Sequence, residues 1–165
     1  MKITYDGVTS VVDSCESADG NKFEYVSRSS KDFNLPKRQT VDSAGYDICS
    51  PEDFEIRPGE IVEIKLQIKV KIVRGEFLLL VPRSSLGWKY NIRLVNTIGI
   101  IDRDYYNNPS NEGELGLKLK NDGDKALFVR KNDRLIQGIF VKYDKTIDDD
   151  VKEERIGGFG STGTR

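Results

Sequence analysis

Residues 64–72 read Ile-Lys-Leu-Gln-Ile-Lys-Val-Lys-Ile, with apolar and polar side chains alternating without a break. Successive side chains of a β-strand point to opposite faces of a sheet, so this pattern predicts a strand with one buried and one solvent-facing side. Pro58-Gly59, shortly before it, indicates a turn. The most regular segment of the chain therefore favours β structure.

Further strands are expected along the rest of the chain, with little helix. Leucines alternate with Gly or Lys over residues 115–120, which predicts a second strand of the same kind. The apolar run 77–81 is interpreted as a strand buried on both faces. Many short strands separated by Gly and Pro predict an all-β sandwich or barrel. Two more strands, at 126–129 and 135–143, are expected on the two sides of the turn 131–133. At most one short helix is expected, at 84–90.

The two ends of the chain differ from its middle. Residues 1–30 are expected to be an N-terminal extension with the first strands of the same domain, including a small hairpin within residues 1–22. Residues 31–143 form the expected core. Residues 144–165 begin as a charged linker and end in a glycine-rich segment, which predicts a flexible C-terminal arm. A length of 165 residues suits one domain with its own core.

Charge and hydropathy argue against several classes of protein. Lys and Arg total 26 against 27 Asp and Glu, a balance that argues against a broad nucleic-acid-binding surface. No apolar run approaches the length of a membrane span, and the first residues lack the apolar core of a signal peptide. We therefore expect a cytoplasmic protein without nucleic-acid or membrane partners. Cys15 and Cys49 are expected as free thiols, with a single disulfide as the alternative.

The chain contains no histidine. This excludes a Ser-His-Asp or Cys-His nucleophile and any His-rich zinc site. Acid–base chemistry would have to use carboxylates, Lys, Tyr or Cys. A metal, if one is used, is expected to be a hard cation with oxygen ligands, such as magnesium.

Five polar segments stand out, although each has an ordinary structural explanation when taken alone. Arg83 and Ser84 follow an apolar strand and suit an anion site. Asp102 follows an apolar pair, a setting in which a carboxylate gains basicity. Residues 158–163 begin like a phosphate-binding P-loop, but the Lys and Ser or Thr of that motif do not follow. The five segments are Ala-Gly-Tyr-Asp-Ile at 44–48, Pro-Arg-Ser-Ser at 82–85, and residues 99–106, 132–140 and 155–163.

In this order the five segments resemble the five motifs of the trimeric dUTPase family, and the resemblance extends over residues 36–163. The segments 99–106 and 155–163 are the most specific matches. Ser85 and Asn107 stand where the family usually has glycine. The loop 107–113 is longer than usual, and the last motif is one residue shorter after Arg155.

The resemblance implies an all-β, dUTPase-like jelly roll (β-clip) that assembles as a homotrimer with shared active sites. Such an enzyme hydrolyses dUTP to dUMP and pyrophosphate, which controls the dUTP level and supplies dUMP for thymidylate synthesis. Asp102 would be the general base that activates a water for attack on the α-phosphorus. Mg²⁺ would bridge the triphosphate oxygens, with Asp47 holding it through water.

The same resemblance assigns the substrate contacts. The phosphates would be held by Arg83, Ser84, Gln137 and Arg155, and the uracil edge by the hairpin that contains Asn96. Tyr105 would lie under the sugar and exclude a ribose 2′-hydroxyl, while Phe159 would cover the base. The implied substrate-binding residues are Arg83, Ser84, Ser85, Asn96, Gly99, Ile100, Ile101, Tyr105, Gly116, Gln137, Arg155, Phe159, Gly160 and Ser161.

Two alternatives stay open at this stage. A dCTP deaminase shares the jelly roll, but it needs a further acid–base residue acting at the ring amine. A nucleotide-binding regulatory trimer is the non-enzymatic alternative, against which the intact Asp102 argues. A second role is left open for residues 1–30 or 107–113, as the surface for an unidentified protein partner.

Overall fold

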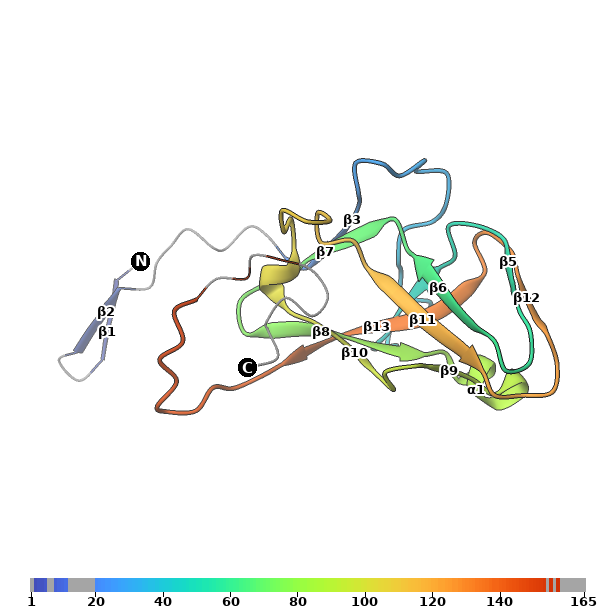
Figure 1. Ribbon diagram of the computed structural model, residues 1–165. Coiled ribbons are helices and arrows are strands. Elements are labelled where there is room, and N and C mark those ends of the chain that lie inside the picture. The colour runs from blue at the N-terminus through green and yellow to red at the C-terminus, as the bar shows by residue number, and fades with distance from the viewer. Residues whose placement is uncertain (1, 6–7, 12–19, 154, 156, 158–165) are drawn as a thin grey trace.

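The computed structural model describes residues 2–5, 8–11, 20–153, 155 and 157. It is almost entirely β structure, as expected (Figure 1). The strands are β1 (Lys2–Tyr5), β2 (Val8–Val11), β3 (Lys22–Tyr25), β4 (Tyr46–Cys49), β5 (Phe54–Ile56), β6 (Ile61–Lys65), β7 (Ile68–Lys71), β8 (Glu76–Pro82), β9 (Ile92–Leu94), β10 (Gly99–Ile101), β11 (Gly116–Asn121), β12 (Leu127–Val129) and β13 (Arg134–Lys142). The helices are α1 (Ser84–Tyr90) and the 3-10 turn η1 (Arg103–Tyr105).

The strands form antiparallel sheets around one core. The largest has the order β10-β8-β13-β4, and a second has the order β6-β11-β9. The pairs β12-β5, β3-β7 and β1-β2 complete the described part. Ile48, Leu78, Leu94 and Leu119, from four different strands, belong to one buried apolar cluster. The hairpin β1-β2 confirms the extra hairpin expected near the N-terminus, and it lies away from the main body (Figure 1).

The single strand predicted over residues 64–72 is wrong in one respect. The segment is divided into β6 and β7, because Gln67 adopts a left-handed backbone conformation with φ of 56°. Its amide donates to the Glu114 carboxylate at 3.1 Å, and its carbonyl accepts from Val26. The alternation of burial is nevertheless confirmed, since Ile64 and Val70 face the core. Residue periodicity shows which side is buried, but it does not detect one residue that redirects the chain.

The strand predicted over residues 77–81 is confirmed as β8. The prediction that it is buried on both faces is wrong for the single chain. Leu78 and Leu80 are buried, whereas Phe77, Leu79 and Val81 are only half-buried in the single chain. One face of β8 therefore packs into the core and the other keeps apolar surface uncovered.

The short helix, the turn at 131–133 and the free thiol of Cys49 are confirmed. Helix α1 occupies residues 84–90 and ends at Asn91, whose φ of 56° stops the helix. The turn at 131–133 contains Asn132 with φ of 71°, although β12 and β13 on its two sides belong to different sheets. Cys49 is a buried free thiol, and burial raises its pKa. Cys15 lies outside the described residues.

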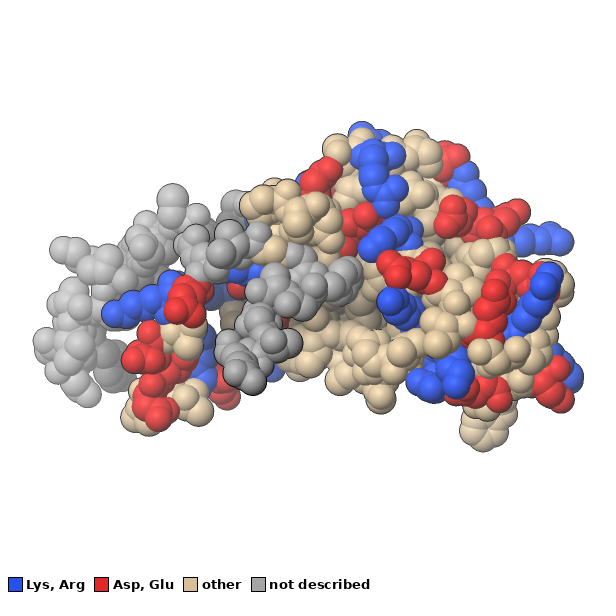
Figure 2. Space-filling model, in the orientation of Figure 1, with Lys and Arg blue, Asp and Glu red and all other residues tan. Residues whose placement is uncertain are grey.

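On the face shown in Figure 2, basic and acidic side chains are intermingled, in keeping with a formal net charge of −1. Among the described residues, no helix has the length and apolar character needed to cross a membrane.

Asn121 connects three parts of the fold and provides a test of the packing. Its buried Nδ2 donates to the carbonyls of Ile56 and Lys125 at 3.0 and 2.8 Å, and its Oδ1 accepts from Gly123. Asn121→Ala leaves these groups without partners, so we expect the free energy of unfolding to fall by about 2–3 kcal/mol in urea titrations. Lys125→Ala, which removes a side chain from the same turn but keeps its backbone carbonyl, is the control. Equal stability of the two variants would contradict this role for Asn121.

Candidate functional site

A cleft of about 440 Å³ opens beside the hairpin that contains β10. Its walls include five of the residues expected to contact the substrate, from the β10 hairpin and from β11 of the other sheet: Asn96, Gly99, Ile100, Ile101 and Gly116. Leu80, Leu94 and Leu117 add apolar surface. Backbone groups of the hairpin and an apolar wall are suited to a planar base.

The sheet register explains why glycine stands at position 99. Gly99 pairs with Leu80 of β8, and a Cβ added at Gly99 would meet the Leu80 Cβ at 3.0 Å. A larger residue there would push the hairpin away from β8.

The rim of the cleft carries an ion-pair cluster that the sequence did not single out. Glu63 lies 3.3 Å from Lys65 and 3.3 Å from Lys118, and all three residues line the cleft. The alternation of β6 and β11 places these side chains on the solvent side of the sheet. That pattern identifies them as surface residues without indicating a site.

Asp102 directly follows the last wall residue of β10, Ile101. Its side chain is about 50% exposed in the single chain, so the preceding apolar pair shields it only in part. Arg155 Nη2 lies 2.7 Å from its carboxylate, and Arg155 Nε lies 3.0 Å from Asp104. The Arg155 guanidinium also lies over the ring of Tyr105, 5.8 Å from its centroid. Despite the shortened last motif, Arg155 reaches the carboxylate of the expected base.

A second polar cluster surrounds Asp47 on β4. Asp47 is only 4% exposed, and it pairs with Arg83 Nε and Arg134 Nη1, each at 3.2 Å. Gln137 Nε2 donates to the same carboxylate at 3.4 Å. The register explains this gathering, because Gln137 on β13 stands between Asp47 of β4 and Val81 of β8.

Arg134 is a member of this cluster that sequence reasoning missed. An ion pair between the neighbours Asp133 and Arg134 would be ordinary at the start of a strand. Instead, Asp133 accepts from the Arg130 amide, and Arg134 reaches across the sheet to Asp47. Its place in the fourth matched segment was the only available signal.

The remaining expected substrate-binding residues have fewer described contacts. Ser84 and Ser85 begin α1 immediately after Arg83, with Ser84 exposed. Phe159, Gly160 and Ser161 of the expected arm lie outside the described residues.

The described residues contain no group of three or more acidic, Cys or His side chains that could hold a metal by themselves. The carboxylate of Asp47 accepts hydrogen bonds from Arg134 and Gln137 and lies 3.2 Å from Arg83 Nε, whereas a carboxylate accepts about four hydrogen bonds. It keeps capacity for a metal-bound water, which suits a magnesium ion whose remaining ligands come from the substrate and solvent.

The two polar clusters are separated along β8. Ile101, just before Asp102, pairs with Leu78, whereas Arg83 follows the end of the strand. Five residue steps at about 3.3 Å each place them roughly 17 Å apart along the strand. One phosphate group cannot touch both clusters of the same chain.

A family model described as dUTPase matches residues 31–163. The chain belongs to the dUTPase family. It is 42% identical over 144 residues to the deoxyuridine 5′-triphosphate nucleotidohydrolase of Lactococcus lactis, covering 86% of this chain and 96% of the relative.

Solved structures agree with this assignment. The crystal structure of dUTPase from Streptococcus mutans superposes with a TM-score of 0.71 at 38% identity, covering 79% of this chain and 100% of that one. The dUTPase from phage phi11 of S. aureus has the same fold, with a TM-score of 0.66 at 24% identity over 82% of this chain and 97% of that one. The dUTPase-like jelly roll expected from the sequence is thus confirmed.

The Asp47 cluster gives a prediction that needs no substrate. Asp47→Asn removes the one carboxylate between two guanidiniums and leaves their charges uncompensated. We expect the free energy of unfolding to fall by about 2 kcal/mol, less than the roughly 3–5 kcal/mol of a fully buried pair, because both arginines are partly exposed. Asp42→Asn, an exposed change of the same kind, is the control in chemical unfolding. An Asp47→Asn protein as stable as the control would show that the cluster is not held by this carboxylate.

Proposed function

We propose that the chain hydrolyses dUTP to dUMP and pyrophosphate in active sites that are shared between the chains of a homotrimer. The reaction follows from membership of the dUTPase family, whose curated relatives are named for it. The sharing of the sites rests on the separation of the Asp102 and Asp47 clusters in one chain.

A neighbouring chain can supply the cluster that one chain cannot bring near its own base. In this arrangement Asp102 of one chain faces Arg83 and Gln137 of the next. The uncovered apolar face of β8 and the exposed Ile100 of β10 are suited to such an interface, because both lack cover in the single chain and Ile100 lines the cleft.

The chemistry proposed for these residues is positioning and charge stabilisation. Asp102 takes a proton from the water that attacks the α-phosphorus, and pyrophosphate leaves. Arg83 binds phosphate oxygens, and its buried Nε has no well-aligned hydrogen-bond partner within the described part of the chain. Gln137 and Arg155 add donors, with Ser84 and Ser85 beside Arg83. Mg²⁺, when bound, offsets charge on the phosphates.

Arg155 has a specific place in this proposal. In the single chain its guanidinium is paired with Asp102 and Asp104. A bound triphosphate carries more negative charge than these two carboxylates, so Arg155 is proposed to move to the phosphates and release Asp102 to act as the base. Phe159, Gly160 and Ser161 of the same arm would then cover the nucleotide.

Recognition of the nucleotide uses the cleft. Backbone groups of Gly99, Ile100 and Ile101, together with Gly116 and the Asn96 side chain, surround the space for the uracil ring. Tyr105 is proposed to lie under the deoxyribose and to leave no room for a 2′-hydroxyl.

The deaminase alternative is not favoured, because the family model and the relatives are those of the hydrolase. The proposal that residues 107–113 bind a protein partner gains no support either, since their polar side chains bond largely within this chain.

The role of Asp102 is tested by Asp102→Asn, which is nearly isosteric but cannot accept the proton. We expect kcat for pyrophosphate release from dUTP with Mg²⁺ to fall by about 10²–10⁴-fold, while calorimetry still shows dUTP binding. Asp104→Asn is the matched control, because Asp104 also pairs with Arg155 but has no proposed role in proton transfer. A rate close to wild type for Asp102→Asn would exclude it as the base.

A further inference from the structure

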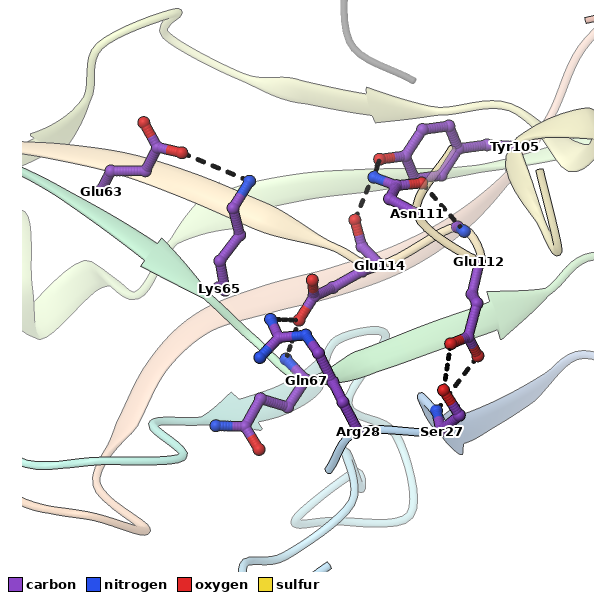
Figure 3. A network of polar contacts seen from close by, with 10 residues as sticks. Ser27, Arg28, Glu63, Lys65, Gln67, Tyr105, Asn111, Glu112 and Glu114 are labelled. Atoms are coloured by element: carbon purple, nitrogen blue, oxygen red, sulfur yellow. Dashed lines mark hydrogen bonds and ion pairs between the residues drawn. The ribbon is translucent and has the colours of Figure 1, made fainter. Parts of the chain in front are cut away.

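The loop that follows Tyr105 in the chain fixes its side chain through hydrogen bonds. It is only 4% exposed, and its hydroxyl donates to the Glu114 carbonyl at 2.9 Å. The same hydroxyl accepts from Asn111 Nδ2 at 2.8 Å. A phenol has one proton to donate, so these two bonds fix the outer end of the ring in one place (Figure 3).

The backbone end of Tyr105 is held by the same loop. Asn108 Nδ2 donates to the Tyr105 carbonyl at 2.9 Å and to Asn111 Oδ1 at 2.6 Å. The two asparagines therefore link both ends of the tyrosine through one chain of hydrogen bonds. Asn108 is itself only 4% exposed, so it is not a surface residue with an incidental contact.

Gly113 shows how closely this loop is fitted to Tyr105. It has φ of 78°, and a Cβ added there would lie 2.5 Å from the Tyr105 carbonyl oxygen. The loop crosses directly over the tyrosine backbone, at a point where only glycine fits.

The loop is in turn fastened to the segment that follows β3. The Ser27 amide and hydroxyl both donate to the Glu112 carboxylate, and these bonds lower the pKa of the Glu112 carboxyl. Arg28 pairs with Glu114, which also accepts from the Gln67 amide (Figure 3). Part of the segment expected to be an N-terminal extension thus braces the loop behind Tyr105.

We propose that residues 107–114 are a positioning loop that fixes Tyr105 through Asn108 and Asn111 and thereby sets the preference of the enzyme for 2′-deoxyribose over ribose. This inference rests on the proposed function, in which Tyr105 lies under the sugar. A ring that is free to shift by a fraction of an ångström would admit the 2′-hydroxyl. A ring held at both ends cannot make that room.

The test is Asn111→Asp. The carboxylate keeps the oxygen that accepts from Asn108 and Gly113, but it presents an acceptor to the Tyr105 hydroxyl in place of the amide donor. Asn107→Asp is the matched control, because it makes the same change in the same loop, on a side chain that accepts from Lys69 instead.

The measured quantity is the ratio of kcat/KM for dUTP to kcat/KM for UTP. We expect this ratio to fall by roughly five- to tenfold in Asn111→Asp, as for loss of one hydrogen bond, and to stay unchanged in Asn107→Asp. A merely structural role would lower both kcat/KM values together and leave the ratio where it was.

Tyr105→Phe removes the hydroxyl and tests the same link if Asn111→Asp proves unstable. We expect it to lower the ratio at least as far, because both bonds of the hydroxyl are lost. The double variant should be no worse than Tyr105→Phe, which already lacks the bond that Asn111→Asp breaks. Additive effects would overturn the inference.

Tyr105→Ala separates this inference from the proposed function. If Tyr105→Ala lowers the ratio while Asn111→Asp and Tyr105→Phe keep it, the loop does not position the ring and the inference is overturned, while the proposed function stands. If the wild-type protein releases no pyrophosphate from dUTP, the proposed function fails and the inference fails with it.

Discussion

The antiparallel pairing of β8 with β10 on one side and β13 on the other is the constraint on which the rest of the molecule depends. The pairing with β10 places the cleft and Asp102 near Leu78. The pairing with β13 brings Gln137, and through it Asp47, to the Val81 end of the strand. Because the hydrogen bonds of a sheet fix the register, these two groups of polar residues cannot approach one another within a chain. The proposed sharing of sites between chains is a consequence of this separation.

The electrostatics of the single chain follow from the same arrangement. Arg83 and Arg134 share the Asp47 carboxylate, and Arg155 bridges Asp102 and Asp104. The guanidiniums proposed to bind phosphate are therefore already paired with carboxylates, which offsets the cost of holding like charges in a partly buried setting. When a triphosphate binds, its oxygens would replace the carboxylates as the partners of these guanidiniums. Substrate binding and release of the base would then be one event.

The sequence was sufficient to predict the β fold, because alternation and turn residues are local signals. It predicted α1 at 84–90 for the same reason, whereas the residues of the cleft hairpin were implied by the resemblance to the dUTPase family. It did not predict the interruption at Gln67, which depends on Glu114 and Val26, both distant in sequence. Arg134 was missed because its partner lies on another strand, and Glu63 because a charged residue on the solvent side of a strand is ordinary. The loop 107–113 was left open as one of two partner surfaces, since its many polar residues gave no indication that they bond to one another.

The central claim, that an active site draws Asp102 and Arg83 from different chains, is most directly tested by mixing two defective variants. Asp102→Asn chains and Arg83→Ala chains would be co-expressed with different tags, and trimers carrying both tags isolated before pyrophosphate release is measured. In a closed ring of three chains that holds both variants, one junction of the three joins an intact Asp102 to an intact Arg83, so about a third of the sites should be complete. We therefore expect activity well above that of either variant alone. Mixed trimers no more active than the better of the two variants would contradict the shared site, because a site built within one chain always keeps one of the two defects.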